Sequence, residues 1–145
     1  GLRKRVIVNV YVGALYLTEK KSNGNDVVNA PGAKRVFLHM LRDLTGQQFV
    51  DAMKESVKYN TPQADLDKMG GDLTEFYAQL GSISEMKAGT AVWVDLLPGT
   101  GLVISAGGKP IGKAISNADL YKAVLRIYVG DKPVDEGLKK GMLGA

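Results

Sequence analysis

The 145-residue sequence predicts an α+β domain in which an antiparallel β-sheet carries helices packed on one face. Three observations support this fold class. The predicted elements come as a strand pair, a helix pair, a strand meander and a second helix pair, and do not alternate. Eighteen glycines, mostly at turn-like positions, indicate short elements joined by tight connections. The hydrophobic content of 45% and the charged content of 23% are typical of a globular domain.

The first strand is predicted over residues 6–17, which are rich in β-branched and aromatic side chains. Its even positions from Val6 to Ala14 form an apolar stripe with a period of two, whereas its odd positions are mixed. We therefore expect the odd face to be solvated or to line something polar. Residues 19–33 carry turn-forming side chains. A second strand over residues 35–42 is apolar on both faces, which favours a central place in the sheet.

A capping box predicts the start of the first helix. Thr45 is followed three residues later by Gln48, and apolar residues then recur at Phe49, Met53 and Val57. This helix is expected to end near residue 59.

A second helix is expected to follow directly, with Thr61 as its cap and Pro62 in its first position. Its apolar stripe extends through residues 66–80, the glycines at 70 and 71 indicate a kink, and Gly81 ends it.

The C-terminal half begins with three short strands over residues 91–97, 102–106 and 110–113, joined by glycine turns into an antiparallel meander. Trp93 points away from the face of its two valine neighbours, so it belongs either to the core, which we favour, or to a cavity wall. A helix capped at Ser116 and closed by Gly130 follows. A short last helix after Pro133 completes the chain.

Composition excludes several kinds of site. With no cysteine and one histidine, the chain has no disulfide, thiolate zinc site, cysteine nucleophile or histidine-rich metal cage, so we expect no metal. The lone His39 lies within an apolar strand and is expected to be a packed or surface residue, not a general base. The glycine turns complete neither a phosphate loop nor a dinucleotide fingerprint, so we expect no cofactor.

Net charge and hydropathy limit the kinds of partner that the protein could bind. The net charge of +4 is spread along the chain and lacks a dense basic patch with interleaved aromatics, so we expect no nucleic acid partner. No apolar run approaches the roughly 18 to 20 residues of a membrane-spanning helix, so we expect no transmembrane segment. The oligomeric state is left open.

Three blocks of sequence carry a family resemblance: residues 1–3 with 8–17 (GLR and VNVYVGALYL), residues 44–49 (LTGQQF) and residues 119–130 (DLYKAVLRIYVG). Together they resemble the chalcone isomerase family. The turn at residues 97–101 (LPGTG) and the tail at residues 131–134 (DKPV) add a likeness to its bacterial chalcone isomerase-like branch. The resemblance covers nearly the whole chain. It implies an open-faced β-sandwich with a ligand cleft between sheet and helices, which agrees with the fold class predicted from the residues.

The resemblance also shows which catalytic groups are replaced. The plant enzymes of this family cyclise a chalcone with an arginine, a threonine, a tyrosine, a lysine and an asparagine. The arginine resembles Arg3 and the threonine falls on Tyr11, while the other three fall on Phe49, Ala52 and Ser56. Phe49 lacks a hydroxyl and Ala52 lacks a charge, which weakens oxyanion stabilisation and proton transfer. We therefore assign no catalytic residue.

Non-catalytic relatives in plants bind fatty acids through an arginine and a tyrosine, and the tyrosine position corresponds to Tyr11. An arginine fork and a phenol hydroxyl suit a buried carboxylate. On one straight strand, Arg3 and Tyr11 would be about 27 Å apart, so they meet only if the chain folds back between them. Arg5 is the alternative arginine. The implied ligand-binding residues are Arg3, Asn9, Tyr11, Phe49, Ser56 and Ile127.

Three functional hypotheses follow. The first is a non-catalytic domain that binds a small apolar ligand or carboxylate such as a fatty acid. The second is an intramolecular lyase or isomerase acting on a chalcone-like, enone or phenolic substrate in the same cleft. The third is a scaffold or partner-binding domain, which an exposed apolar patch would favour.

The resemblance also bears on domain limits and location. We expect a single chalcone isomerase-like domain over residues 1–145 that lacks the first N-terminal strands of the family. The likeness to the bacterial branch implies a periplasmic or secreted protein, and any secretory signal would precede those strands.

Overall fold

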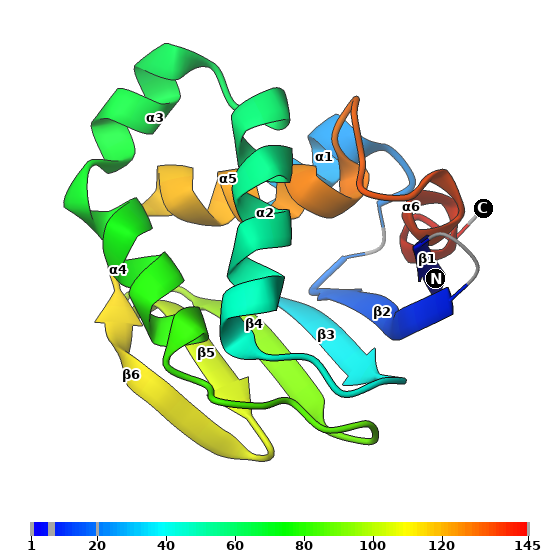
Figure 1. Ribbon diagram of the computed structural model, residues 1–145. Coiled ribbons are helices and arrows are strands. Elements are labelled where there is room, and N and C mark those ends of the chain that lie inside the picture. Colours follow the sequence, from blue (N-terminus) through cyan, green and yellow to red (C-terminus); the bar gives the residue numbers. More distant parts are fainter. Residues whose placement is uncertain (1, 6–7, 20, 145) are drawn as a thin grey trace.

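In the computed structural model of the chain (Figure 1), the backbone is described for residues 2–5, 8–19 and 21–144, and the side chains for residues 11–19 and 21–144. Within this part of the chain, six strands form one sheet in chain order, and every neighbouring pair is antiparallel. The strands are β1 (Leu2–Arg5), β2 (Val8–Leu17), β3 (Lys34–Met40), β4 (Ala91–Leu97), β5 (Gly101–Ala106) and β6 (Lys109–Ile115).

Helices cover one face of this sheet, and α2 crosses α5 over it (Figure 1). The helices are α1 (Gly24–Asn29), α2 (Gly46–Asn60), α3 (Gln63–Met69), α4 (Gly71–Gly81), α5 (Ala118–Val129) and α6 (Glu136–Met142). The predicted α+β class is therefore confirmed, with an open sheet and a helical layer on one side.

The core lies between the sheet and the helices. Eight of the 12 residues of α5 are buried, because this helix lies between the sheet, α1 and α2. The capping box predicted at the start of α2 is present: Gln48 N donates to Thr45 Oγ1 at 3.1 Å, and Thr45 N donates to Gln48 Oε1 at 3.0 Å. This box fixes the first turn of α2 and with it the position of Phe49.

The N-terminal strand differs from the expectation. The strand predicted over residues 6–17 is present as β2 (Val8–Leu17), with residues 6 and 7 outside the described part, but an additional strand, β1, precedes it and pairs with it as a hairpin. The faces of β2 are also exchanged: Tyr11 and Gly13 are buried, whereas Val12 and Tyr16 are exposed. The reason is visible at Gly13, where an added Cβ would lie 2.8 Å from Met142 Cε and 3.0 Å from Leu138 Cδ1. Because glycine has no side chain, α6 can pack closely against β2 at this position. For the same reason, Gly13 adds nothing to the apolar pattern from which the buried face was predicted.

Two further local expectations need correction. The turn-rich residues 19–33 contain the short helix α1, which Asn23 caps by accepting from the amides of Asn25 and Asp26. Thr61 does not cap α3: Pro62 occupies the position before that helix, and Thr61 Oγ1 is buried without a hydrogen-bond partner in the described part of the chain.

Candidate functional site

The β1–β2 hairpin brings two of the predicted ligand-binding positions together. Its register makes Arg3 the direct partner of Tyr11, and Arg5 the partner of Val8. Directly opposite residues of an antiparallel pair lie on the same face of the sheet. Tyr11 is buried on the face of the sheet beneath the helices (Figure 1). The side chains of Arg3 and Asn9 lie outside the described part of the structure.

Tyr11 packs against the first turn of α2. Its side chain is 1% exposed and that of Phe49 is 2% exposed, and their ring centroids are 6.3 Å apart in an edge-on arrangement at 62°. Such edge-to-face pairs are a favoured aromatic geometry and add to the free energy gained by burial. The pair links the hairpin to the helical layer.

The remaining predicted positions lie along α2 and α5. Ser56 is two helical turns beyond Phe49 and therefore on the same face of α2. It is half-buried, and its main-chain oxygen accepts a hydrogen bond of 2.9 Å from Asn60 Nδ2. Ile127 is buried on α5, which packs against α2. Asn9 is paired with Lys4, next to an irregularity in the β1–β2 register.

Two positions of α2 near Tyr11 carry no ionisable group. Phe49 contributes only an aromatic ring, and Ala52, one turn further along α2, contributes only a methyl group. A general acid or base must reach the reacting atom with a titratable group. Within residues 11–19 and 21–144, no cluster of three or more His, Asp or Glu side chains is arranged to hold a metal ion.

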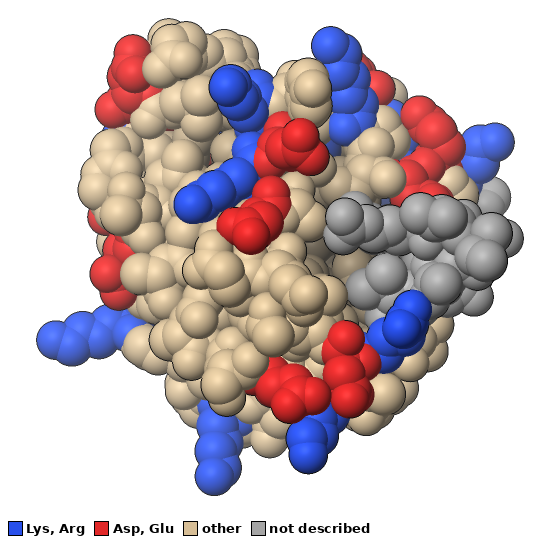
Figure 2. All heavy atoms as spheres, in the orientation of Figure 1, with Lys and Arg blue, Asp and Glu red and all other residues tan. Residues whose placement is uncertain are grey.

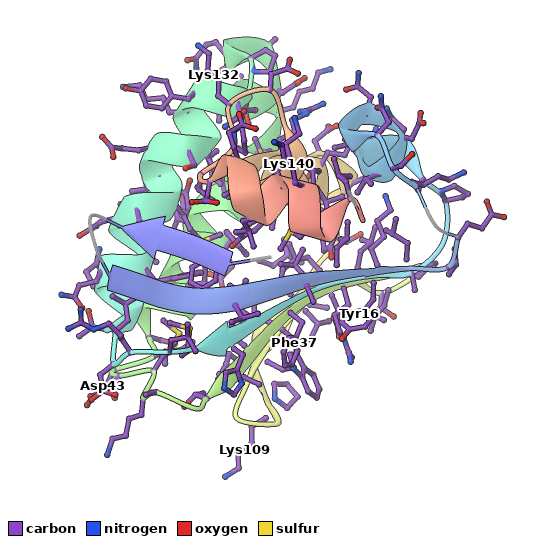
Figure 3. All side chains as sticks on the ribbon, turned by 90° about the vertical axis from the view of Figure 1, so that its right-hand side faces the viewer. Tyr16, Phe37, Asp43, Lys109, Lys132 and Lys140 are labelled. Atoms are coloured by element: carbon purple, nitrogen blue, oxygen red, sulfur yellow. The ribbon has the colours of Figure 1, made fainter. Side chains whose placement is uncertain are left out.

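The opposite face of the sheet carries a second group of side chains, which the sequence reasoning did not assign to a site. Arg35 Nε and Nη2 donate to the two carboxylate oxygens of Asp95 at 2.8 and 2.9 Å, and the guanidinium lies 4.3 Å from the ring centroid of Trp93. These hydrogen bonds to the Asp95 carboxylate raise the pKa of Arg35. Figure 3 shows Tyr16 and Phe37 on this face, away from the helices.

This open face is hollowed. A cavity of about 470 Å³ is lined by Tyr16, Arg35, Phe37 and Trp93, among others. Trp93 is thus part of a cavity wall and not of the core that the sequence favoured, and its indole Nε1 is buried without a hydrogen-bond partner in the described part of the chain. Asp95, two residues after Trp93, could have indicated its position, as Arg35 does on the neighbouring strand. Residues at alternate positions of a strand share a face, and charged residues mark the face exposed to solvent.

Charged side chains do not gather by sign on the face shown in Figure 2, where Lys and Arg are interspersed with Asp and Glu over the described residues. Among the described residues, no helix is both long and apolar enough to cross a membrane.

Comparison with known proteins gives two findings. The sequence profile of the family described as chalcone isomerase-like matches residues 1–144. The fold is similar to the crystal structure of a fatty-acid binding protein from Arabidopsis thaliana, with a TM-score of 0.73 and 19% sequence identity, over 99% of this chain and 83% of that chain. No curated protein sequence matches the chain.

Proposed function

Since the chain belongs to the chalcone isomerase-like family, we propose that it is a non-catalytic protein that binds an apolar carboxylate, such as a fatty acid, between its sheet and its helices. In this proposal Arg3 and Tyr11 bind the carboxylate, and the acyl chain contacts Phe49, Ser56 and Ile127. Asn9 lies beside the carboxylate end.

The strand register carries this proposal. A buried carboxylate needs charge-assisted hydrogen bonds, and an arginine opposite a tyrosine supplies a guanidinium and a phenol hydroxyl from neighbouring strands. The hairpin makes Arg3 the direct partner of Tyr11, whereas Arg5 is opposite Val8. This register favours Arg3 over Arg5 as the ligand residue.

The chemistry of α2 supports binding over catalysis. The Tyr11 ring meets Phe49, and Ala52 follows on the next turn, so the family's positions for a catalytic phenol and ammonium carry neither group. The structural neighbour from Arabidopsis thaliana is itself described as a fatty-acid binding protein. The alternative, a lyase or isomerase acting on a chalcone-like or phenolic substrate, predicts turnover in a spectrophotometric chalcone assay that Arg3→Ala abolishes.

The binding test uses dodecanoate titrated into the delipidated protein by calorimetry. Arg3→Gln and Tyr11→Phe each remove a hydrogen bond to a charged group, which corresponds to roughly tenfold weaker binding or more. The matched controls are Arg5→Gln and Tyr59→Phe, since Tyr59 is exposed. Native mass spectrometry of protein purified from cells tests whether a lipid is carried. No dodecanoate binding by the wild type, or equal loss in the controls, contradicts the proposal.

The likeness of the sequence blocks to the bacterial branch extends the proposal to location. We propose that the protein acts in the periplasm or outside the cell, where an apolar acid would need a carrier to move through water. Fractionation of cells that express the natural gene tests this, and recovery from the cytosol alone contradicts it.

A further inference from the structure

A separate cavity lies at the other end of β3 from Tyr11. Its walls come from the connection between α1 and β3, the turn between β4 and β5, and the start of α5, and its volume is about 420 Å³. Lys34 lines it, at the start of β3, whereas Tyr11 is paired with Met40 at the end of that strand. Six residues of strand separate these two positions, a distance of about 20 Å. The cavity is therefore distinct from the proposed fatty-acid site.

Lys34 is the unusual member of this cavity. Its side chain is 6% exposed, and its Nζ donates one hydrogen bond, of 3.2 Å, to the main-chain oxygen of Val28. An ammonium group has three donors. Within residues 11–19 and 21–144, no carboxylate forms an ion pair with Lys34. A buried cation without a counter-charge is costly, so its presence calls for a partner.

A second positive charge converges on the same cavity. Lys122, on the first turns of α5, also lines it. Burial lowers the pKa of Lys34, and the charge of Lys122 lowers it further, as expected for two ammonium groups that repel each other. The positive end of the α5 dipole faces the same space, since α5 begins at Ala118 in the wall. An anion bound between the two lysines would relieve this repulsion.

The rest of the wall is largely apolar. Val28 and Tyr121 are buried, Leu96 is half-buried, and Pro98 lies at the exposed rim. Ligand sites of this size typically combine an apolar surface with a few polar groups that fix orientation. The cavity therefore suits a molecule with one anionic end and a short apolar body.

We propose that this cavity binds an anionic group, a carboxylate or a phosphate monoester, carried on a short apolar stem. The ammonium groups of Lys34 and Lys122 bind the anion, and Val28, Leu96 and Tyr121 contact the stem. This site is independent of Arg3 and Tyr11, so the two ligands bind at the same time.

The experiment titrates four probes into the ¹⁵N-labelled full chain: hexyl phosphate, hexanoate, inorganic phosphate and hexan-1-ol. We expect hexyl phosphate and hexanoate to bind and to shift amides in residues 28–34, 96–101 and 116–122, while hexan-1-ol binds at least tenfold more weakly. Binding of inorganic phosphate with the same affinity as hexyl phosphate would contradict the role of the apolar wall. Hexyl phosphate shifts that leave out these three segments would contradict the site, whereas hexanoate shifts around Tyr11 belong to the proposed fatty-acid site.

Variants then test the lysines. Lys34→Met is expected to weaken hexyl phosphate binding at least tenfold, Lys122→Gln to weaken it several-fold, and Lys34→Arg to restore part of it. The matched control is Lys140→Gln, an exposed lysine on α6. Unchanged affinity in Lys34→Met and Lys122→Gln overturns the proposal; if Lys34→Met does not fold, the shift map and Lys122→Gln decide. Tyr11→Phe leaves this affinity unchanged, which separates the result from that of the fatty-acid site.

Discussion

Tyr121 on α5 donates a hydrogen bond of 2.8 Å from its hydroxyl to the main-chain oxygen of Val94 in the central strand β4. Both residues are buried, so this bond joins the helical layer to the sheet away from water. It also orients α5, whose first turns carry Lys122.

Replacing Tyr121 with phenylalanine removes this bond and little volume. We expect the free energy of unfolding to fall by about 1 kcal/mol, since a buried hydrogen bond typically contributes 0.5 to 1.5 kcal/mol. Urea unfolding followed by circular dichroism measures the change. Tyr16→Phe is the control, because Tyr16 is 56% exposed on the open face, and it should leave the unfolding midpoint unchanged. Equal effects in the two variants would contradict the structural role of the bond.

Burial raises the pKa of Tyr77 to about 12, above its ordinary value near 10. The folded state then holds this proton more tightly than the unfolded state does, so stability is present below pH 10 and is lost as the pH rises towards 12. We expect Tyr77→Phe to lose less stability than the wild type between pH 9.5 and pH 11.5 in urea titrations. Tyr59→Phe should follow the wild-type slope, because Tyr59 is exposed. Identical slopes for the wild type and Tyr77→Phe would refute this.

The ion pair of Arg35 and Asp95 joins the neighbouring strands β3 and β4 on the open face of the sheet. Asp95 is 8% exposed and accepts two hydrogen bonds from Arg35. We expect Asp95→Asn to destabilise the protein by about 1 to 2 kcal/mol, since one charge-assisted bond is lost and the other is weakened. A double-mutant cycle with Arg35→Met measures the coupling by chemical denaturation. A coupling energy of zero would mean that the pair adds nothing to stability.

Two glycines should respond in opposite ways to alanine. At Gly46, the first residue of α2, a Cβ would collide with the main-chain oxygens of Leu80 and Ile83, which cannot move aside as a side chain can. At Gly71 no atom lies within 4 Å of the added Cβ. We expect Gly46→Ala to lower the melting temperature severely, and Gly71→Ala to stabilise by about 0.5 kcal/mol through a less flexible unfolded chain. Thermal denaturation of both variants decides, and a tolerated Gly46→Ala would show that α2 can shift away from α4.

Much of the fold could be predicted because its signals are local. The fold class, the meander, the capping box at Thr45 and the extent of α5 to Gly130 all follow from a few neighbouring residues, and the structure contains each of them. The faces of β2 could not be predicted in this way. Gly13 is buried because α6 packs on it, and α6 lies more than a hundred residues further along the chain.

The sequence by itself determined most of the element types, the single open sheet and the family resemblance, because propensity, period and capping act within a few residues. Only the tertiary structure decided that Arg3 is opposite Tyr11, that Arg35 and Asp95 pair on the open face, and that Lys34 is buried without a carboxylate partner in the described part of the chain. Each of these depends on which strands are neighbours and which face the helices cover. Both depend on packing over the whole chain, because burying apolar surface between residues far apart in sequence lowers the free energy of the folded state.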